Sequence, residues 1–180
     1  MRTRTLLTMT LLAAGSSPAR GQFLSPPVIA GVSCDRMEGQ RLHIHQHLVI
    51  LDHGKVIPIP ANVGQRPVSS CLYWLHTHTP DGIIHIEAPL DRAFTLGDFF
   101  EIWGQPLSKT KAASAHAAKG RALRVWVNSK AYTGNPTAIR LDAHTDIVIE
   151  AGPPFPKPQR FASWNEIGRA SCRERVSFLV

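Results

Sequence analysis

Several motifs that commonly mark enzyme active sites are missing from this 180-residue sequence. It contains no His-Glu-x-x-His zinc motif, no nucleophile elbow and no glycine-rich phosphate loop. The usual hydrolytic motifs therefore give no basis for an enzyme class. The longest apolar-leaning stretch near the N-terminus has nine residues, whereas a membrane-spanning helix needs about 20. We expect no stable membrane anchor.

Acidic residues are fewer than basic ones, but the imbalance lies mostly at the two ends of the chain. The whole sequence has 20 Lys and Arg against 13 Asp and Glu, a formal net charge of +7. The segment 22–165 holds 14 basic and 11 acidic residues, a net charge of only +3. A mildly basic domain does not require a polyanionic partner, so we expect no binding to nucleic acid.

The N-terminus has the layout of a secretory signal peptide. Arg2 and Arg4 precede the short apolar stretch at 6–14, and a small-x-small cleavage pattern ends at Gly21. We therefore predict a signal peptide at 1–21 and a secreted or periplasmic protein.

Cysteine is scarce, with only three in the chain. Cys34 and Cys71 lie in the body of the protein, and an exported protein meets an oxidising compartment in which they can pair. A disulfide between them would close a loop of about 37 residues and contribute roughly 2–4 kcal/mol. Two free buried thiols are one alternative, and a lipid anchor on Cys34 is another, although residues 31–33 fit a lipid-attachment box poorly.

The last fifteen residues, 166–180, differ from the rest of the chain. They show no helical or strand periodicity and introduce the third cysteine, Cys172. This segment resembles a translated sequencing-adapter read-through, so we predict a non-native tail at 166–180. The segment 22–165 is then a single domain, of a length that can bury its own core.

Seven of the nine histidines lie between positions 43 and 85, and six of these lie inside predicted strands, mostly at every second residue. Side chains two residues apart in a strand point to the same face. In the predicted strand 42–51 this alternation separates three histidines from Leu and Ile. In the predicted hairpin of 72–78 and 83–87 it places polar residues and Trp74 opposite Leu and Ile. The histidines that share the polar face are His43, His45, His47, His76, His78 and His85.

Several imidazoles on one sheet face are typical of a transition-metal site, because imidazole is the commonest nitrogen ligand of zinc and copper. The six histidines are therefore candidate ligands, of which four at most fill a tetrahedral sphere. A ligand set without thiolate or methionine favours zinc or copper(II), and the sequence does not separate these two ions. Glu87 shares the face and is a candidate to orient an imidazole or to act as acid or base on a metal-bound water. We expect His53, in a turn, and His116 to be solvated.

The remaining segments predict one helix and more strands. Thr95 with Asp98 forms a capping pair, Gly104 ends the helix, and an apolar stripe recurs between them. Residues 109–120 are expected to form a loop or a frayed helix. Strands are predicted at 123–127, 131–133 and 146–150. This order indicates an α+β fold, a small antiparallel sheet of hairpins with one helix packed on its apolar face.

Four sequence motifs together resemble a family of uncharacterised secreted bacterial proteins. They are His-x-His-x-His-Leu at 43–48, Cys-Leu-Tyr-Trp-Leu-His-Thr-His at 71–78, Gly-Ile-Ile-His-Ile-Glu-Ala-Pro at 82–89, and Phe-Thr-Leu-Gly through Ile-Trp-Gly at 94–104. The resemblance runs over 34–152. It implies export and a shared histidine site, and it does not point to any particular activity.

Three classes of function fit the sequence. The first is an exported protein that binds copper or zinc through the histidine cluster. The second is a metal-dependent enzyme, a zinc hydrolase or a copper oxidoreductase, with Glu87 as acid or base. The third is a structural or interaction domain that binds no metal. Histidine nitrogens that converge on one point would favour the first two classes over the third.

Overall fold

The structure is a computed structural model, and it describes residues 26–164 and 167. The predicted signal peptide and the predicted tail lie outside these residues, apart from Ile167. Within the described part of the chain, no helix has the length and hydropathy of a membrane span.

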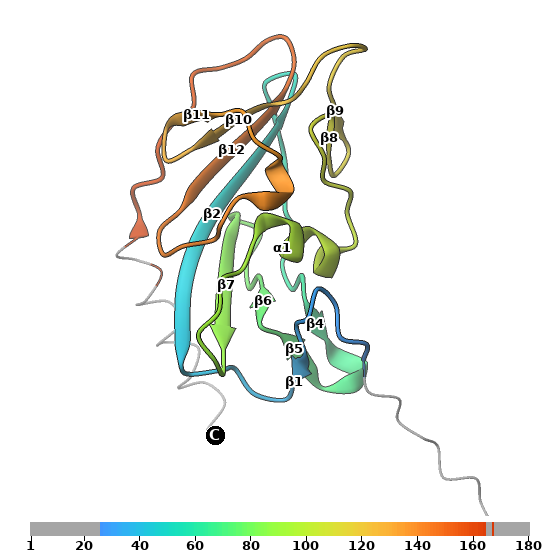
Figure 1. Ribbon diagram of the computed structural model, residues 1–180, viewed down its shortest axis with the longest axis vertical. Coiled ribbons are helices and arrows are strands. Elements are labelled where there is room, and N and C mark those ends of the chain that lie inside the picture. The colour runs from blue at the N-terminus through green and yellow to red at the C-terminus, as the bar shows by residue number, and fades with distance from the viewer. Residues whose placement is uncertain (1–25, 165–166, 168–180) are drawn as a thin grey trace, which may run out of the picture.

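A seven-stranded sheet forms the centre of the fold, and its longest strand, β2, runs through the middle (Figure 1). The strand order is β11-β10-β12-β2-β7-β6, with β3 paired to β2. The strand bounds are β2 Leu42–Asp52, β3 Lys55–Ile57, β6 Leu75–His76, β7 Ile83–Ala88, β10 Arg124–Val127, β11 Lys130–Tyr132 and β12 Asp146–Ala151. Most residues of the predicted strands 42–51, 83–87, 123–127, 131–133 and 146–150 lie in these strands.

The sheet is mixed, so the prediction of a purely antiparallel sheet of hairpins is wrong in this respect. β12 pairs with β2 in parallel, with Asp146 opposite His47 and Ile149 opposite Ile50. The two strands are about a hundred residues apart in the chain, and local hydrophobic alternation contains no information about such a pairing. The coarser prediction of an α+β fold agrees with the structure.

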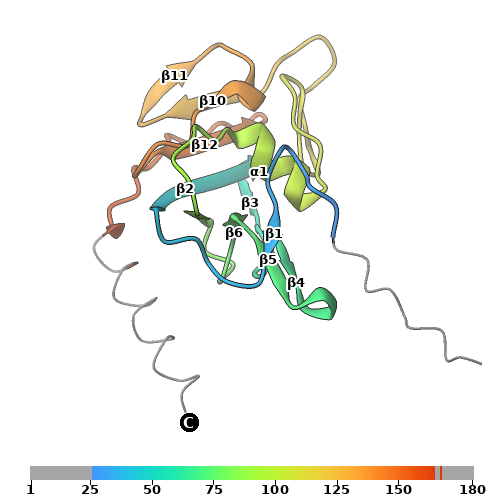
Figure 2. The ribbon, with the colours of Figure 1, turned by 60° about the horizontal axis from the view of Figure 1, so that its bottom comes forward.

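Two smaller sheets flank the main one. One is the pair β8 and β9, described below. The other has the order β1-β5-β4, with the bounds β1 Cys34–Asp35, β5 Cys71–Tyr73 and β4 Gln65–Arg66. A short 3₁₀ helix, η1 Pro67–Ser69, follows β4. The predicted disulfide is present in this sheet, with the Cα atoms of Cys34 and Cys71 5.5 Å apart. Figure 2 shows these three strands together below the main sheet.

The predicted strand 72–78 is interrupted at Trp74. β5 belongs to the small sheet, whereas β6 pairs with β7 in the main sheet. The Trp74 indole donates to Asp35 Oδ2 at 2.6 Å, and its ring lies 6.3 Å from the Phe94 ring within the hydrophobic core. Trp74 therefore packs in the core, although the alternation groups it with the histidines.

Residues 109–120 contain no helix, and the loop that was the other expectation is interrupted by two short strands. They form a hairpin of β8 Lys111–Ala112 and β9 Ala115–His116. Ala113 adopts a positive φ of 49° at the turn, while Ala112 and Ala115 are fully buried. Burial of these small side chains outweighs their helical preference, since tertiary packing routinely overrides propensity.

The helix α1, Leu96–Trp103, begins and ends where the sequence predicts. The Thr95 hydroxyl accepts from the Asp98 backbone N–H, and the Asp98 carboxylate accepts from Thr95 N–H, which completes a capping box. Gly104 closes the helix at a φ of 72°. The second 3₁₀ helix, η2, spans Pro136–Ala138.

One hydrophobic core contains residues of both the helix and the main sheet. Its fully buried members include Leu48, Ile50, Ile84, Ile86, Leu96, Phe99, Phe100, Ile147 and Ile149. All six strand residues in this set come from the face opposite the histidines. The core thus holds β2, β7 and β12 rigidly and leaves their other face for polar chemistry.

Candidate metal centre

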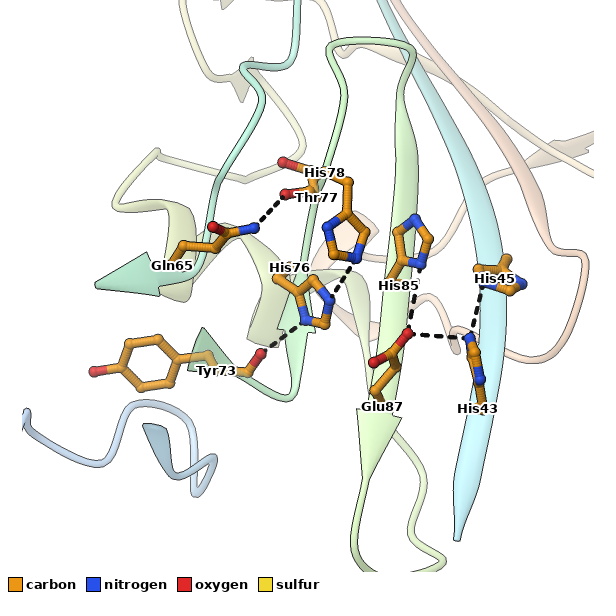
Figure 3. A network of polar contacts seen from close by, with 9 residues as sticks. All are labelled: His43, His45, Gln65, Tyr73, His76, Thr77, His78, His85 and Glu87. Carbon is orange, nitrogen blue, oxygen red and sulfur yellow. Dashed lines mark hydrogen bonds and ion pairs between the residues drawn. The ribbon is translucent and has the colours of Figure 1, made fainter. Parts of the chain in front are cut away.

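Three histidines form a row across three neighbouring strands of the main sheet. His45 on β2 lies directly opposite His85 on β7, and His76 on β6 lies opposite His85 from the other side. Glu87 on β7 lies opposite His43 on β2, two residues along each strand from the pair of His45 and His85. Residues directly opposite each other share a face, so this register agrees with the predicted histidine face. Figure 3 shows the side chains converging from both sides on β7.

The β2 pair consists of His43 and His45. Their Nε2 atoms are 3.2 Å apart. His43 Nε2 also lies 3.0 Å from Oε1 of the buried Glu87. Because a carboxylate oxygen only accepts, His43 Nε2 carries the proton in this contact. A metal ion bound here would displace that proton.

The β6 pair consists of His76, the last residue of β6, and His78, two residues beyond it; their Nε2 atoms are also 3.2 Å apart. His76 Nδ1 lies 3.0 Å from the Tyr73 carbonyl oxygen, to which it must donate. In the neutral ring this contact leaves the lone pair on Nε2, the atom that faces His78. A backbone carbonyl that fixes the tautomer in this way is the usual outer partner of a metal-binding histidine.

Thr77 anchors the β6 pair from behind. Its hydroxyl donates to the Pro60 carbonyl at 2.8 Å and accepts from Val63 N–H at 3.0 Å. Its backbone N–H donates to the Val63 carbonyl at 3.1 Å. Gly64 allows the backbone next to Val63 to lie close to β6, since a Cβ on Gly64 would lie 2.5 Å from the Leu75 carbonyl oxygen. The two histidines flanking Thr77 therefore have little freedom to move apart.

His85 stands between the two pairs and has an unsatisfied nitrogen. Its Nδ1 is buried and has no hydrogen-bond partner. Oε1 of the Glu87 carboxylate lies 3.8 Å away, which is too long for a hydrogen bond. A buried polar atom without a partner costs about 1–3 kcal/mol. A metal ion is one group that would satisfy this nitrogen.

The donor atoms form two groups, and within each group all ligand atoms lie within 4.8 Å of one another. One group is His76, His78, His85 and Glu87, and the other is His43, His45 and His85. Five of the six predicted histidine ligands and Glu87 are therefore brought together.

Three of these histidines remain neutral well below neutral pH. Burial, with a smaller effect from His85 and His43, lowers the pKa of His45 to about 4. Burial, with a smaller effect from His78 and His85, lowers the pKa of His76 to about 3. Burial also lowers the pKa of His85 to about 4. Neutral imidazole is the form that binds metal.

His47, the sixth predicted ligand, lies outside both groups. Its Nδ1 donates to Asp146 Oδ1 at 2.9 Å, and its ring stacks on Phe161 at 4.1 Å. The Asp146 carboxylate also accepts from Phe161 N–H at 3.0 Å. These contacts do not support the prediction that His47 binds metal. No sequence pattern points to Asp146, because only the long-range pairing of β2 with β12 brings it beside His47.

Four further polar residues, Asp81, His144, His53 and His116, lie outside both donor groups. Asp81 Oδ1 accepts from Ile83 N–H at 3.0 Å, a contact typical of a turn. His144 is exposed and stacks on Trp164, with ring centroids 4.8 Å apart. His53 and His116 are exposed, as the sequence predicts.

Comparisons of the chain with protein-family models, with curated proteins and with solved structures found no match. The resemblance to the secreted bacterial family therefore stays a prediction. The geometry of the histidine cluster is the basis on which a function can be assigned.

Proposed function

We propose that this chain is an exported protein that binds zinc or copper through the histidine cluster of β2, β6 and β7. The observation that carries this proposal is the buried, unpartnered Nδ1 of His85, surrounded by nitrogen and carboxylate donors from three strands. A merely solvated polar face would not bury donors of this kind together. His76, His85 and Glu87 are each at most 5% exposed.

The donor set favours zinc or copper(II) over other ions. Imidazole nitrogens dominate both groups, only the group with His76 includes a carboxylate, and neither group includes a sulfur ligand. Imidazole suits zinc and copper, whereas magnesium and calcium prefer oxygen ligands, and copper(I) prefers sulfur.

Export is supported by the disulfide between Cys34 and Cys71. Disulfides persist in oxidising compartments such as the periplasm and the extracellular space, and they are rare in the cytosol. Together with the signal-like N-terminus, this favours metal binding outside the cytoplasm.

The proposal predicts that single histidine variants weaken metal binding. His45→Ala and His76→Ala each remove one nitrogen ligand, and we expect the dissociation constant for Zn²⁺ or Cu²⁺ to rise roughly 10-fold or more. Isothermal titration at neutral pH, with a chelator competition for tight binding, measures the change. The matched controls are His53→Ala and His116→Ala, which remove exposed imidazoles outside the groups and should bind like the wild type. The same affinity as the wild type in all four variants would show that the strand histidines are not ligands, and would leave them as the polar face of a structural domain.

Acid release gives a second prediction. Protons compete with the metal only when the pH approaches the pKa values of the ligands, and these are about 3–4 for His45, His76 and His85. We therefore expect half of the bound metal to be released well below the pH of about 6.5 at which free imidazole titrates. Dialysis across a pH series followed by elemental analysis measures the midpoint. A midpoint above about pH 6 would show that these buried histidines are not the ligands.

A metal-dependent enzyme is the second candidate, and one observation favours it. His78 lies on the wall of an open cavity of about 380 Å³ that Arg36, Glu38, Gln65 and Arg66 also line. A substrate placed there would reach the edge of the metal site. Turnover of ester, phosphate or phenol substrates by the metal-loaded protein would establish catalysis, and His78→Ala should abolish it.

A further inference from the structure

The donors of the metal centre outnumber what one ion takes, and they are divided in space. Six side chains provide ligand atoms, whereas a tetrahedral zinc site uses four. The β2 pair and the β6 pair fall into different groups, and His85 is the residue common to both. The strand order β2-β7-β6 explains this division, because β7 lies between the two pairs.

Each outer pair already has the spacing of two ligands on one ion. Zinc–nitrogen bonds of about 2.0–2.1 Å at tetrahedral angles place two ligand nitrogens about 3.3 Å apart. The Nε2–Nε2 distance is 3.2 Å in the β2 pair and also 3.2 Å in the β6 pair. The match is the same on both sides of β7, although the two pairs come from different segments of the chain.

The Glu87 carboxylate connects the two sides. Its Oε1 lies 3.0 Å from His43 Nε2 of the β2 pair, and the same residue belongs to the group that contains the β6 pair. Figure 3 shows this carboxylate between the two pairs and beside His85. A carboxylate has two oxygens and can bind two cations at once, and the ions of two-metal sites are typically about 3.5–4 Å apart.

We propose that the centre holds two metal ions, one on the His43–His45 pair and one on the His76–His78 pair, with the Glu87 carboxylate bridging them. His85 completes the coordination of one of the two ions through its buried nitrogen. This inference rests on the proposed metal-binding function and goes beyond it by fixing the number of ions and the residues of each.

Metal stoichiometry tests the proposal on the intact mature protein. After dialysis against Zn²⁺ or Cu²⁺ at neutral pH, native mass spectrometry should show two ions per chain in the wild type. His43→Ala and His78→Ala should each retain one ion, because each variant breaks a different pair. Glu87→Gln keeps the side-chain shape but weakens the bridge, so it should also fall to one ion. His53→Ala and His116→Ala should keep two, and circular dichroism should show every variant folded.

Electron paramagnetic resonance of the Cu²⁺ form provides a second measurement. Two ions joined by Glu87 should give a magnetically coupled spectrum in the wild type and an uncoupled single-copper spectrum in His43→Ala and in His78→Ala. One ion in the wild type, or two ions retained in both variants, would overturn the two-ion proposal while leaving metal binding intact. No ion bound to the wild type would instead overturn the proposed function itself.

Discussion

The metal-free protein should lose stability on the order of several kcal/mol as the pH falls from about 6.5 to about 4. The pKa values of His45, His76 and His85 are about 4, 3 and 4 in the folded protein, against about 6.5 in an unfolded chain. Above this unfolded value all three are neutral in both states and contribute no pH dependence. At lower pH the unfolded chain takes up protons that the folded protein does not, so unfolding is favoured. The loss levels off as the pH reaches the folded-state values.

Each proton that the unfolded chain binds and the folded protein does not contributes about 1.4 kcal/mol per pH unit to this loss. The effect of His45 is smaller than the shift suggests, because this side chain is only partly buried and water screens it. Urea denaturation of chelator-treated protein across a pH series from neutral to acid measures the free energy of unfolding. His76→Gln removes one of the three groups, so the decline over this series should be smaller in this variant. His116→Ala is the matched control and should decline like the wild type. The same decline in His76→Gln as in the wild type would contradict the prediction.

Removing the disulfide should destabilise the protein by roughly 2–4 kcal/mol. The bond closes a loop of 37 residues, and its loss lets the unfolded chain occupy more conformations. It also joins β1 to β5, and β5 leads through Trp74 into the strand that bears His76. The Tyr73 carbonyl that holds His76 Nδ1 is two residues from Cys71. The double variant Cys34→Ala/Cys71→Ala should therefore both unfold at lower urea concentration and bind metal more weakly.

Mass spectrometry first establishes the bond in the mature protein. The peptide pair containing both cysteines should be two hydrogens lighter than its reduced form. Reductant should lower the urea midpoint of the wild type and leave that of the double variant unchanged. If both thiols react with an alkylating agent without reductant, the disulfide is not formed and the stability prediction fails with it.

The elements set by local physics could be predicted from the sequence. The alternation of apolar and histidine residues in β2 and β7 marks one buried and one polar face, and the pairing of His45 with His85 agrees with it. Thr95, Asp98 and Gly104 set the ends of α1 through contacts within a few residues. The turn at His53 and Gly54, both at positive φ, joins β2 to β3 for the same local reason.

The parts that depend on distant segments could not be predicted. Nothing near Asp146 indicates that its strand lies parallel to β2, so neither the mixed sheet nor the His47–Asp146 contact could be predicted. The change of sheet at Trp74 depends on Asp35 and Phe94, which are distant in the chain. The division of the histidines into two groups likewise follows from the position of β7 between β2 and β6, an order that a single sequence does not contain.

The parallel pairing of β2 with β12 has a consequence for the order in which the molecule folds. His43 and Glu87 are 44 residues apart in the chain, whereas His47 and Asp146 are 99 apart. Contacts between distant residues are costlier to close and form more slowly. The strands that bear the candidate ligands all lie within residues 42–88, so they can meet while β12 is still unattached. β12 would then pair with β2 after the histidine-bearing strands have met.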